Sequence, residues 1–418
     1  QSGALWTHAA NTDGGAPWVA NAFVNVAVSG NFDLQAGATI SADSRGYAGS
    51  APGGGAGKGP GGGQQYISGG GGGHGGLGGD GSGGSAFGGV ADGSLASPAE
   101  PGSGGAGDGG ASASGGAGGG VVILAVGGTL SVDGLISANG GGAAGAGQGG
   151  GGGAGGAIDL TAATLGGAGI VRAAGGGGTA GSYFGGGGGG GRVALLSTSA
   201  DTSNLALSAG AGAAGGGAAV SGGAGTIVVK RPGMGDYHLL ALSPDVVAGA
   251  ATPVTGASLS FSSITVHGGR LVFDAGSVVA ASNLFTSSGT STVQFSTITA
   301  AGLLFPAGAS TLTGSALNVT AGGVRVSTAS AATLNVSTVA VAVGTLEVNA
   351  YSTATLNGLL LQLPDSLTVG FGAILGPNLS SVTFGAGTGL TVQNGGTVSQ
   401  STTTRLNVLG VVTLQSGA

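Results

Sequence analysis

Residues 175–191 read GGGGTAGSYFGGGGGGG and lead directly into RVALL at 192–196, so a glycine run ends abruptly in a short apolar segment. The same join occurs three more times, with apolar segments that begin at Val121, Ala157 and Thr226. The central apolar residues are spaced 35, 35 and 34 positions apart: Ile123, Ile158, Val193 and Ile227. A fixed period of this length indicates a solenoid or another repeat array.

A second strand signal keeps nearly the same step. It recurs as Ile136-Ser137-Ala138, Val171-Arg172-Ala173 and Leu207-Ser208-Ala209, and Ile40-Ser41-Ala42 repeats the pattern near the start of the chain. We therefore place N-terminal strands and the first coil in residues 1–42, with a strand at 23–28. Residues 121–229 are expected to form a glycine-rich β-solenoid with repeats of about 35 residues.

The stretch 43–120 is predicted to be a glycine-rich insertion between neighbouring coils, because it separates Ile40 from its repeat at Ile136. One interpretation is a flexible linker, since glycine-rich chains behave as coils. The other is a set of extended segments of polyproline-II type, which have three residues per turn and leave their backbone groups free to bond to neighbours. We favour the ordered alternative, because glycine runs recur at one place in every repeat and stacked coils would bring them together.

The second half changes composition, because serine, threonine, valine and leucine replace glycine in residues 255–418. Short alternating segments recur there, and closely spaced Leu-x-Val pairs begin at Leu317 and Leu334 and again at Leu390 and Leu406. This pattern predicts a parallel β-helix with coils of roughly 16–22 residues. Residues 230–254 combine charge and proline and are predicted to be a boundary linker. Five Thr-x-Thr pairs at irregular spacing predict ordinary outward-facing threonines.

The composition excludes several classes of protein. Glycine occupies 104 of 418 positions without a Gly-X-Y period, which excludes collagen, and 41% apolar against 6% charged residues is a poor match to a disordered chain. Single scattered charges with a net value of −6 give no support to nucleic-acid binding, and no apolar stretch is long enough to span a membrane. The absence of cysteine excludes disulfides and thiolate metal sites.

No group of residues predicts catalysis, so we expect neither an enzyme nor a cofactor or metal site. The acidic pair Asp236 and Asp245, in the boundary region, lacks the pattern of two opposed carboxylates. The four histidines are far apart, and Lys58 fails the phosphate-loop pattern because Gly59 follows it. Residues 75–80 match the start of a calcium-binding nonapeptide repeat only once, whereas such sites need tandem copies.

Charge is scarce from 255 to 418, where only six side chains carry it. A nearly neutral rod of this kind should associate with partners, and solenoid ends need polar caps to remain soluble. Neither end of this sequence carries such a cap, so we predict an assembly interface there with copies of the same chain. Its expected residues are Trp6, Trp18, Phe23, Val24, Val26, Val408, Val411, Val412 and Leu414.

The glycine-to-strand units, such as 149–156 followed by Ala157-Ile158-Asp159-Leu160, resemble the glycine-rich repeats of large secreted bacterial surface proteins. The second half looks like the β-helical stalks of bacterial adhesins and autotransporter passengers. The resemblance implies a secreted, cell-surface or extracellular protein with a structural or adhesive role. The start at Gln1 is expected to reflect removal of an export signal.

Three functional hypotheses follow. The first is a homopolymer, a filament or sheath whose subunits join head to tail by strand addition. The second is a surface or phage-fibre adhesin that binds cell-surface glycans, or ice, through its glycine loops or a solenoid face. The third is a β-helix polysaccharide enzyme that depends on Asp236 or Asp245.

Overall fold

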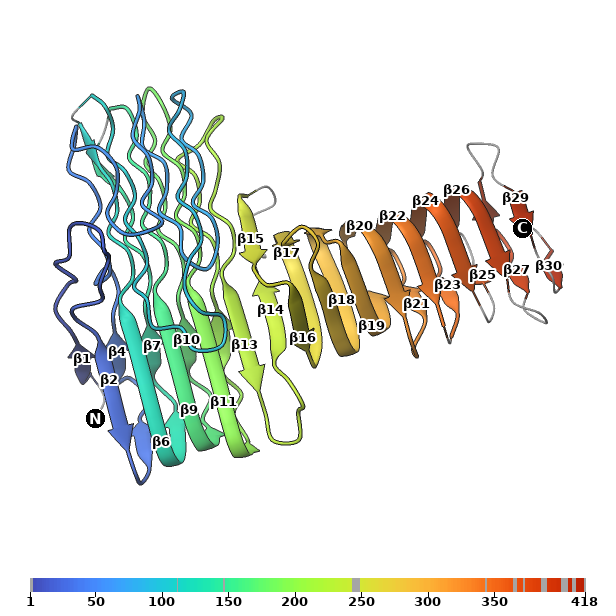
Figure 1. Cartoon of the computed structure of the whole chain (residues 1–418), viewed down its shortest axis with the longest axis horizontal. Helices are drawn as coiled ribbons and strands as arrows, with labels where there is room; N and C mark the ends of the chain where they lie inside the picture. Colours follow the sequence, from blue (N-terminus) through green and yellow to red (C-terminus); the bar gives the residue numbers. More distant parts are fainter. Residues whose placement is uncertain are drawn as a thin grey trace. The chain divides into compact units, whose positions relative to one another are not determined.

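The computed structural model describes residues 3–110, 112–145, 147–242, 249–342, 344–363, 367–370, 373–384, 389–399, 405–407 and 411–416 (Figure 1). These residues form β-strands and no helix, so the chain is all-β with large, mostly parallel sheets, an architecture compatible with a β-solenoid. The chain divides into two compact units, Gln1–Pro253 and Val254–Ala418. The division lies at the end of the predicted boundary region 230–254, which itself carries two strands.

Unit 1 contains two ladders of parallel strands. One ladder has the order β1-β4-β7-β10-β12, and in the other β2 and β3 both pair with β6, followed by β9, β11 and β13, with β14 antiparallel to β13. The strands are β1 (Leu5–Thr7), β2 (Val24–Val28), β3 (Phe32–Leu34), β4 (Thr39–Ser41), β5 (Ala113–Ser114), β6 (Val121–Val132), β7 (Leu135–Ser137), β8 (Ala144–Gly145), β9 (Ala157–Gly166), β10 (Ile170–Arg172), β11 (Arg192–Asp201), β12 (Ala206–Ser208), β13 (Thr226–Lys230), β14 (His238–Leu242) and β15 (Ala251–Val254).

The core of unit 1 consists of columns of apolar side chains that run across the ladders. Strand residues alternate between faces, so residues in register stack on one face. The predicted pairing of Ile40 with Ile136 is confirmed, and both side chains are buried. The prediction for Ile123 was wrong by one residue: Val122, not Ile123, pairs with Ile158 and faces the core. A shift of one residue reverses the face of a strand, so Ile123 is only half-buried.

The glycine pair Gly127-Gly128 makes no turn, although paired glycines are typical of turns. It lies inside β6, where the register with β9 shifts between Val126 and Thr129. Glycine in a strand often marks a bulge or a close approach by another segment. Here an added Cβ would lie 2.6 Å from Ser29 O at Gly127 and 2.3 Å from Asn31 Oδ1 at Gly128. After β6 the chain turns at Asp133 and Gly134, and β7 begins at Leu135.

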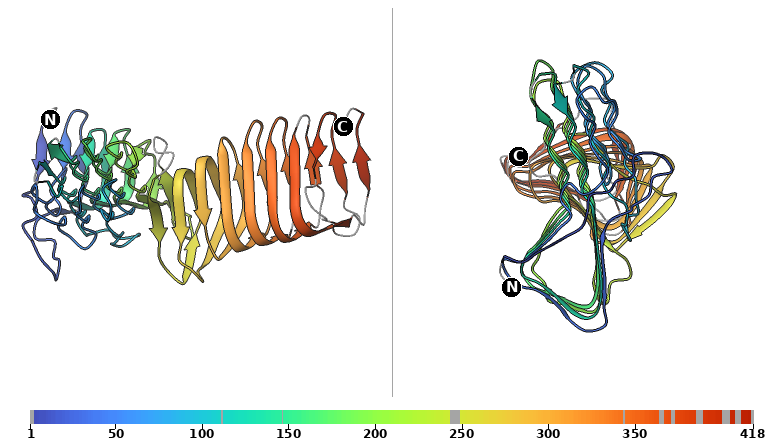
Figure 2. Two further views of the ribbon diagram at one scale, coloured as in Figure 1. Left: turned by 90° about the horizontal axis from the view of Figure 1, so that it is seen from above. Right: turned by 90° about the vertical axis from the view of Figure 1, so that its left-hand side faces the viewer.

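The glycine-rich segments run side by side beyond the strands of unit 1 (Figure 1), and the end-on view shows them as a layer apart from the ladders (Figure 2). Their hydrogen bonds repeat every third residue. Gly186 and Gly189 donate to Gly69 and Gly72, at 3.0 and 2.8 Å. The next pair in the run, 187 and 190, donates to residues 220 and 223, and residues 185, 188 and 191 donate to 179, 176 and 173.

The carbonyl groups of the run 185–191 follow the same rule. Residues 186 and 189 accept from 152 and 155, residues 187 and 190 from 79 and 76, and residues 185 and 188 from 215 and 212. The run is therefore bonded to six neighbouring segments, two of which belong to the insertion 43–120. Its glycines are all buried, and their backbone groups replace side chains as the packing surface.

Unit 2 is a ladder of parallel strands with a shorter step. Its strands are β16 (Ser258–Phe261), β17 (Ser263–Phe273), β18 (Val278–Gln294), β19 (Thr297–Phe305), β20 (Ala309–Val319), β21 (Val324–Val326), β22 (Ala331–Val341), β23 (Leu346–Val348), β24 (Thr353–Leu363), β25 (Leu367–Val369), β26 (Ile374–Phe384), β27 (Leu390–Val392), β28 (Thr397–Val398), β29 (Arg405–Asn407) and β30 (Val412–Leu414).

The spacing of the Leu-x-Val pairs does not measure this step. Leu317 pairs with Val339, and Leu334 pairs with Leu312 and Leu356. One step of the ladder therefore covers the interval from Leu334 to Leu356, which is longer than the interval from Leu317 to Leu334. Leu317 and Leu334 belong to different columns of side chains. The true step aligns threonines whose spacing looks irregular in the sequence, because residues 311, 333 and 355 occupy successive rungs.

Candidate assembly edges

The first edge lies at β1, the outermost described strand of its ladder. It pairs with β4 on one side and with no described strand on the other. Trp6 is in register with Ile40 and therefore begins the core column that continues to Ile136. Ile40 and Ile136 are buried, whereas Trp6 is 46% exposed and the adjacent Leu5 is 66% exposed. A core-facing tryptophan thus lies uncovered at this edge.

A groove of about 200 Å³ opens beside β1 and reaches the end of the core. Its apolar lining includes Leu5, Trp6, Phe32, Leu34 and Ile40. The rings of Trp6 and Phe32 form one wall, with centroids 6.5 Å apart. Because Leu34 and Ile40 are core residues, the groove gives access to the apolar core at this edge.

The predicted residues of the neighbouring strand β2 differ in their placement. Val24 is buried at the end of the column that contains Val122, and Val26 packs half-buried against Leu124. Phe23 precedes β2 and is exposed. β2 pairs only with β6 among the described strands, so its other backbone edge is open to a further strand.

Trp18 lies in the segment between β1 and β2. Its ring meets Tyr47 edge to face, with centroids 5.4 Å apart, so it packs the N-terminal segment onto the glycine-rich insertion. Burial, followed by the nearby carboxylate of Asp13, raises the pKa of Tyr47 to about 12. This contact gives the half-buried ring of Trp18 a packing role within unit 1.

The second edge is β30, which pairs with β27 and with no other described strand. Val412 continues a core column whose earlier members are all buried: Val324, Leu346, Leu367 and Leu390. Leu414 continues the parallel column of Val326, Val348, Val369 and Val392. Val412 is nevertheless 51% exposed and Leu414 68% exposed. Val411 is also exposed, and Val408 lies outside the described residues.

Few charged side chains are described in unit 2, and two of them neutralise each other within the ladder. Arg325 and Glu347 occupy paired positions and form an ion pair of 2.9 Å. Arg270 donates to the side chain of Gln294 at 2.8 Å. The sides of this ladder therefore present little free charge that would repel another copy.

Other chemistry is sparse. No group of three or more His, Cys, Asp or Glu side chains is placed to hold a metal ion in the described part of the chain. Asp245, one of the two acidic residues of the enzyme hypothesis, lies outside the described residues. Within the ranges that the structure describes, no helix is long and apolar enough to cross a membrane.

One buried polar cluster joins residues that no sequence motif connects. His74 has no exposed surface, and its Nδ1 lies 2.8 Å from Asp92 Oδ1. Arg192 donates from Nε to the Asp92 carbonyl at 2.8 Å and from Nη1 to Thr226 Oγ1 at 3.0 Å. Burial lowers the pKa of Arg192, and nearby carboxylates oppose this shift. The cluster joins the insertion to the repeats, and residues so far apart in sequence carry no shared signal.

Comparison with family models, with curated proteins and with solved structures found no match to this chain. The two edges and the glycine layer are therefore the features on which a function can be argued.

Proposed function

We propose that this chain is an extracellular structural protein, a subunit that joins head to tail with its own copies to form a filament or sheath. In this proposal both units are parallel β-solenoids, and the glycine segments of unit 1 are polyglycine-II-like helices stacked on one side of it. The three-residue step of their hydrogen bonds supports this interpretation, because a helix with three residues per turn points every third amide at the same neighbour. The extracellular location rests on the resemblance of the repeats to secreted bacterial surface proteins.

One observation carries the proposal. At both edges, columns of buried apolar side chains end in residues that face the core but remain exposed: Trp6 at β1, and Val412 and Leu414 at β30. A further parallel strand would cover these residues and bond to the free backbone edge. The strand available to each edge in a homopolymer is the opposite edge of another copy, which is a heterologous contact that leaves the assembly open.

The expected affinity is modest. Full burial of a large apolar side chain contributes about 1.5–3 kcal/mol. Covering the exposed parts of four edge side chains therefore contributes about 5 kcal/mol; these are Leu5, Trp6, Val412 and Leu414. Loss of rotational and translational freedom costs roughly 4–15 kcal/mol. Strand hydrogen bonds must supply the rest, and we expect polymers at high protein concentration.

The experiment blocks one edge at a time. Leu5→Lys places a charge at the first edge, and Val412→Lys places one at the second. Val90→Lys and Val278→Lys are matched controls, since these valines are 60% and 50% exposed but lie away from both edges. Sedimentation velocity and negative-stain microscopy over a range of concentrations measure the assembly.

We expect the unaltered chain and both controls to polymerise, and each edge variant alone to remain a monomer. An equal mixture of Leu5→Lys and Val412→Lys should form dimers, because each retains the edge that the other lacks. Dimers of a single edge variant would indicate a joint between like edges and contradict the head-to-tail arrangement. A monomeric unaltered chain at the highest concentration would contradict assembly altogether.

A further inference from the structure

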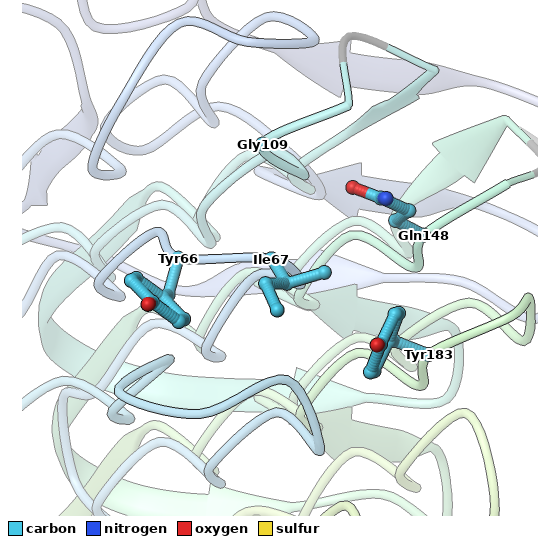
Figure 3. A pocket seen from close by; sticks show the side chains of 5 residues that line it. All are labelled: Tyr66, Ile67, Gly109, Gln148 and Tyr183. Atoms are coloured by element: carbon cyan, nitrogen blue, oxygen red, sulfur yellow. The ribbon is translucent and has the colours of Figure 1, made fainter.

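A pocket of about 330 Å³ opens in the glycine layer of unit 1 and is separate from both edges. Its lining is Tyr66, Ile67, Gly109, Gln148 and Tyr183. Figure 3 shows the two tyrosine rings on either side of Ile67, with the Gln148 amide beyond. These side chains come from the insertion and from two different repeats, so only the packed glycine layer brings them together.

The pocket walls are held in place by hydrogen bonds. Gly109 donates its N–H to Ile67 O at 3.1 Å, which joins two parts of the insertion. The buried carboxylate of Asp108 accepts from the backbone of Ala113 at 2.9 Å and of Gln148 at 3.3 Å. Asp108 thus positions Gln148, and Asp108 itself does not line the pocket.

The groups that face the pocket are neutral, and their polar atoms are available. Neither tyrosine hydroxyl nor the Gln148 amide has a hydrogen-bond partner among the described residues, and both rings are exposed. The volume is at the lower end of the range for small-molecule sites. The surrounding segments consist largely of glycine, and the apolar side-chain surface of the lining comes from the two tyrosine rings and Ile67.

We infer that this pocket binds a neutral carbohydrate. Sugar rings present C–H faces that pack on aromatic rings, and their hydroxyls both donate and accept, which phenol and amide groups can match. Nothing in the lining compensates a charge, so an anionic sugar or a phosphate would be desolvated without a partner. This inference goes beyond assembly and does not depend on it, because none of the five lining residues belongs to either edge.

The test uses the full chain and begins with an array of neutral and anionic oligosaccharides. Soluble cellobiose, maltose and diacetylchitobiose, with sialyllactose as the anionic probe, are then examined at millimolar concentration by saturation-transfer NMR and calorimetry. Tyr66→Ala, Tyr183→Ala and Gln148→Ala remove the three groups in turn. Phe87→Ala is the matched control, because Phe87 is an equally exposed aromatic ring of the insertion outside the pocket.

We expect at least one neutral oligosaccharide to bind, with an affinity at least about tenfold lower for each tyrosine variant and unchanged for Phe87→Ala. Tyr66→Phe should retain most of the binding, since it keeps the ring. Thermal unfolding of each variant identifies any that fails to fold. Binding of the anionic probe alone, equal binding by the tyrosine variants, or no binding by any neutral sugar would overturn the inference. Sedimentation of the same samples measures assembly separately from sugar binding. A failure of the assembly proposal can therefore be distinguished from a failure of the carbohydrate inference.

Discussion

Replacing Gly188 by alanine is the most direct test of the glycine layer. Gly188 donates to Gly176 O at 2.9 Å and accepts from Gly212 N–H at 2.8 Å. An added Cβ would lie 2.1 Å from Gly153 O, whereas ordinary contacts begin near 3.4 Å. The segments must therefore move apart, which would break the 2.8 Å bond that Gly153 O accepts from Gly176. No positive φ is involved, so the effect is purely steric.

The magnitude follows from these contacts. Loss of this one buried hydrogen bond at about 1 kcal/mol, with overpacking of about 1–3 kcal/mol, outweighs a gain of roughly 0.4–1 kcal/mol from a stiffer unfolded chain. We expect a net loss of about 2 kcal/mol, or roughly 4–8 °C in the melting temperature of a unit of this size.

Gly235→Ala is the matched control, because Gly235 also lacks a positive φ and has no atom within 4 Å of an added Cβ. Its stability should change by less than about 0.5 kcal/mol. Unfolding followed by circular dichroism in heat and in denaturant measures both variants. Equal stability of Gly188→Ala and Gly235→Ala would refute the close packing of the layer.

Three further substitutions test the electrostatics of unit 1. Arg192→Met should lower stability by about 2 kcal/mol and speed hydrogen exchange near Asp92, because the carbonyl that Arg192 bonds would lose its donor; unchanged exchange would contradict this. Burial raises the pKa of Asp159 to about 6, so native stability falls as pH rises from about 4 to above 6. Asp159→Asn should melt higher than the unaltered chain at pH 8 and equally at pH 4. Burial by itself would raise the pKa of Asp108, but hydrogen bonds from Ala113 and Ser112 to the carboxylate outweigh this effect, and the pKa is lowered. Asp108→Asn should therefore be less stable at pH 7, with the difference shrinking below about pH 4; a difference that persists at low pH would argue against this.

Much of the ladder arrangement was predictable because its signal is periodic along the chain. Apolar residues that recur at a constant step must stack if coils are stacked, so the pairing of Ile40 with Ile136 across the insertion could be predicted. The same periodicity did not settle the register of β6, because Val122 and Ile123 are both β-branched and only packing decides which one faces the core. In unit 2 different columns contain the same Leu-x-Val pattern. The spacing between Leu317 and Leu334 therefore joins two columns and does not equal the step of the ladder.

The candidate sites likewise include residues that the sequence predicts and residues that only the fold brings together. Trp6 and Val412 are among the residues predicted from the sequence and are exposed, whereas Val24 is buried and the half-buried ring of Trp18 packs against Tyr47. The tyrosine pocket and the cluster around His74 had no signal in the sequence, since their members are joined only by the fold.

The sequence by itself determined that this protein is built from repeated strands and glycine runs, because hydrophobic periodicity and the position of glycine act locally. The tertiary structure alone decided which glycine segments become neighbours. A glycine carries no side chain to specify a partner, and its amide and carbonyl can bond to any backbone that approaches closely enough. The set of six segments to which residues 185–191 bond therefore follows from how the whole repeats pack together.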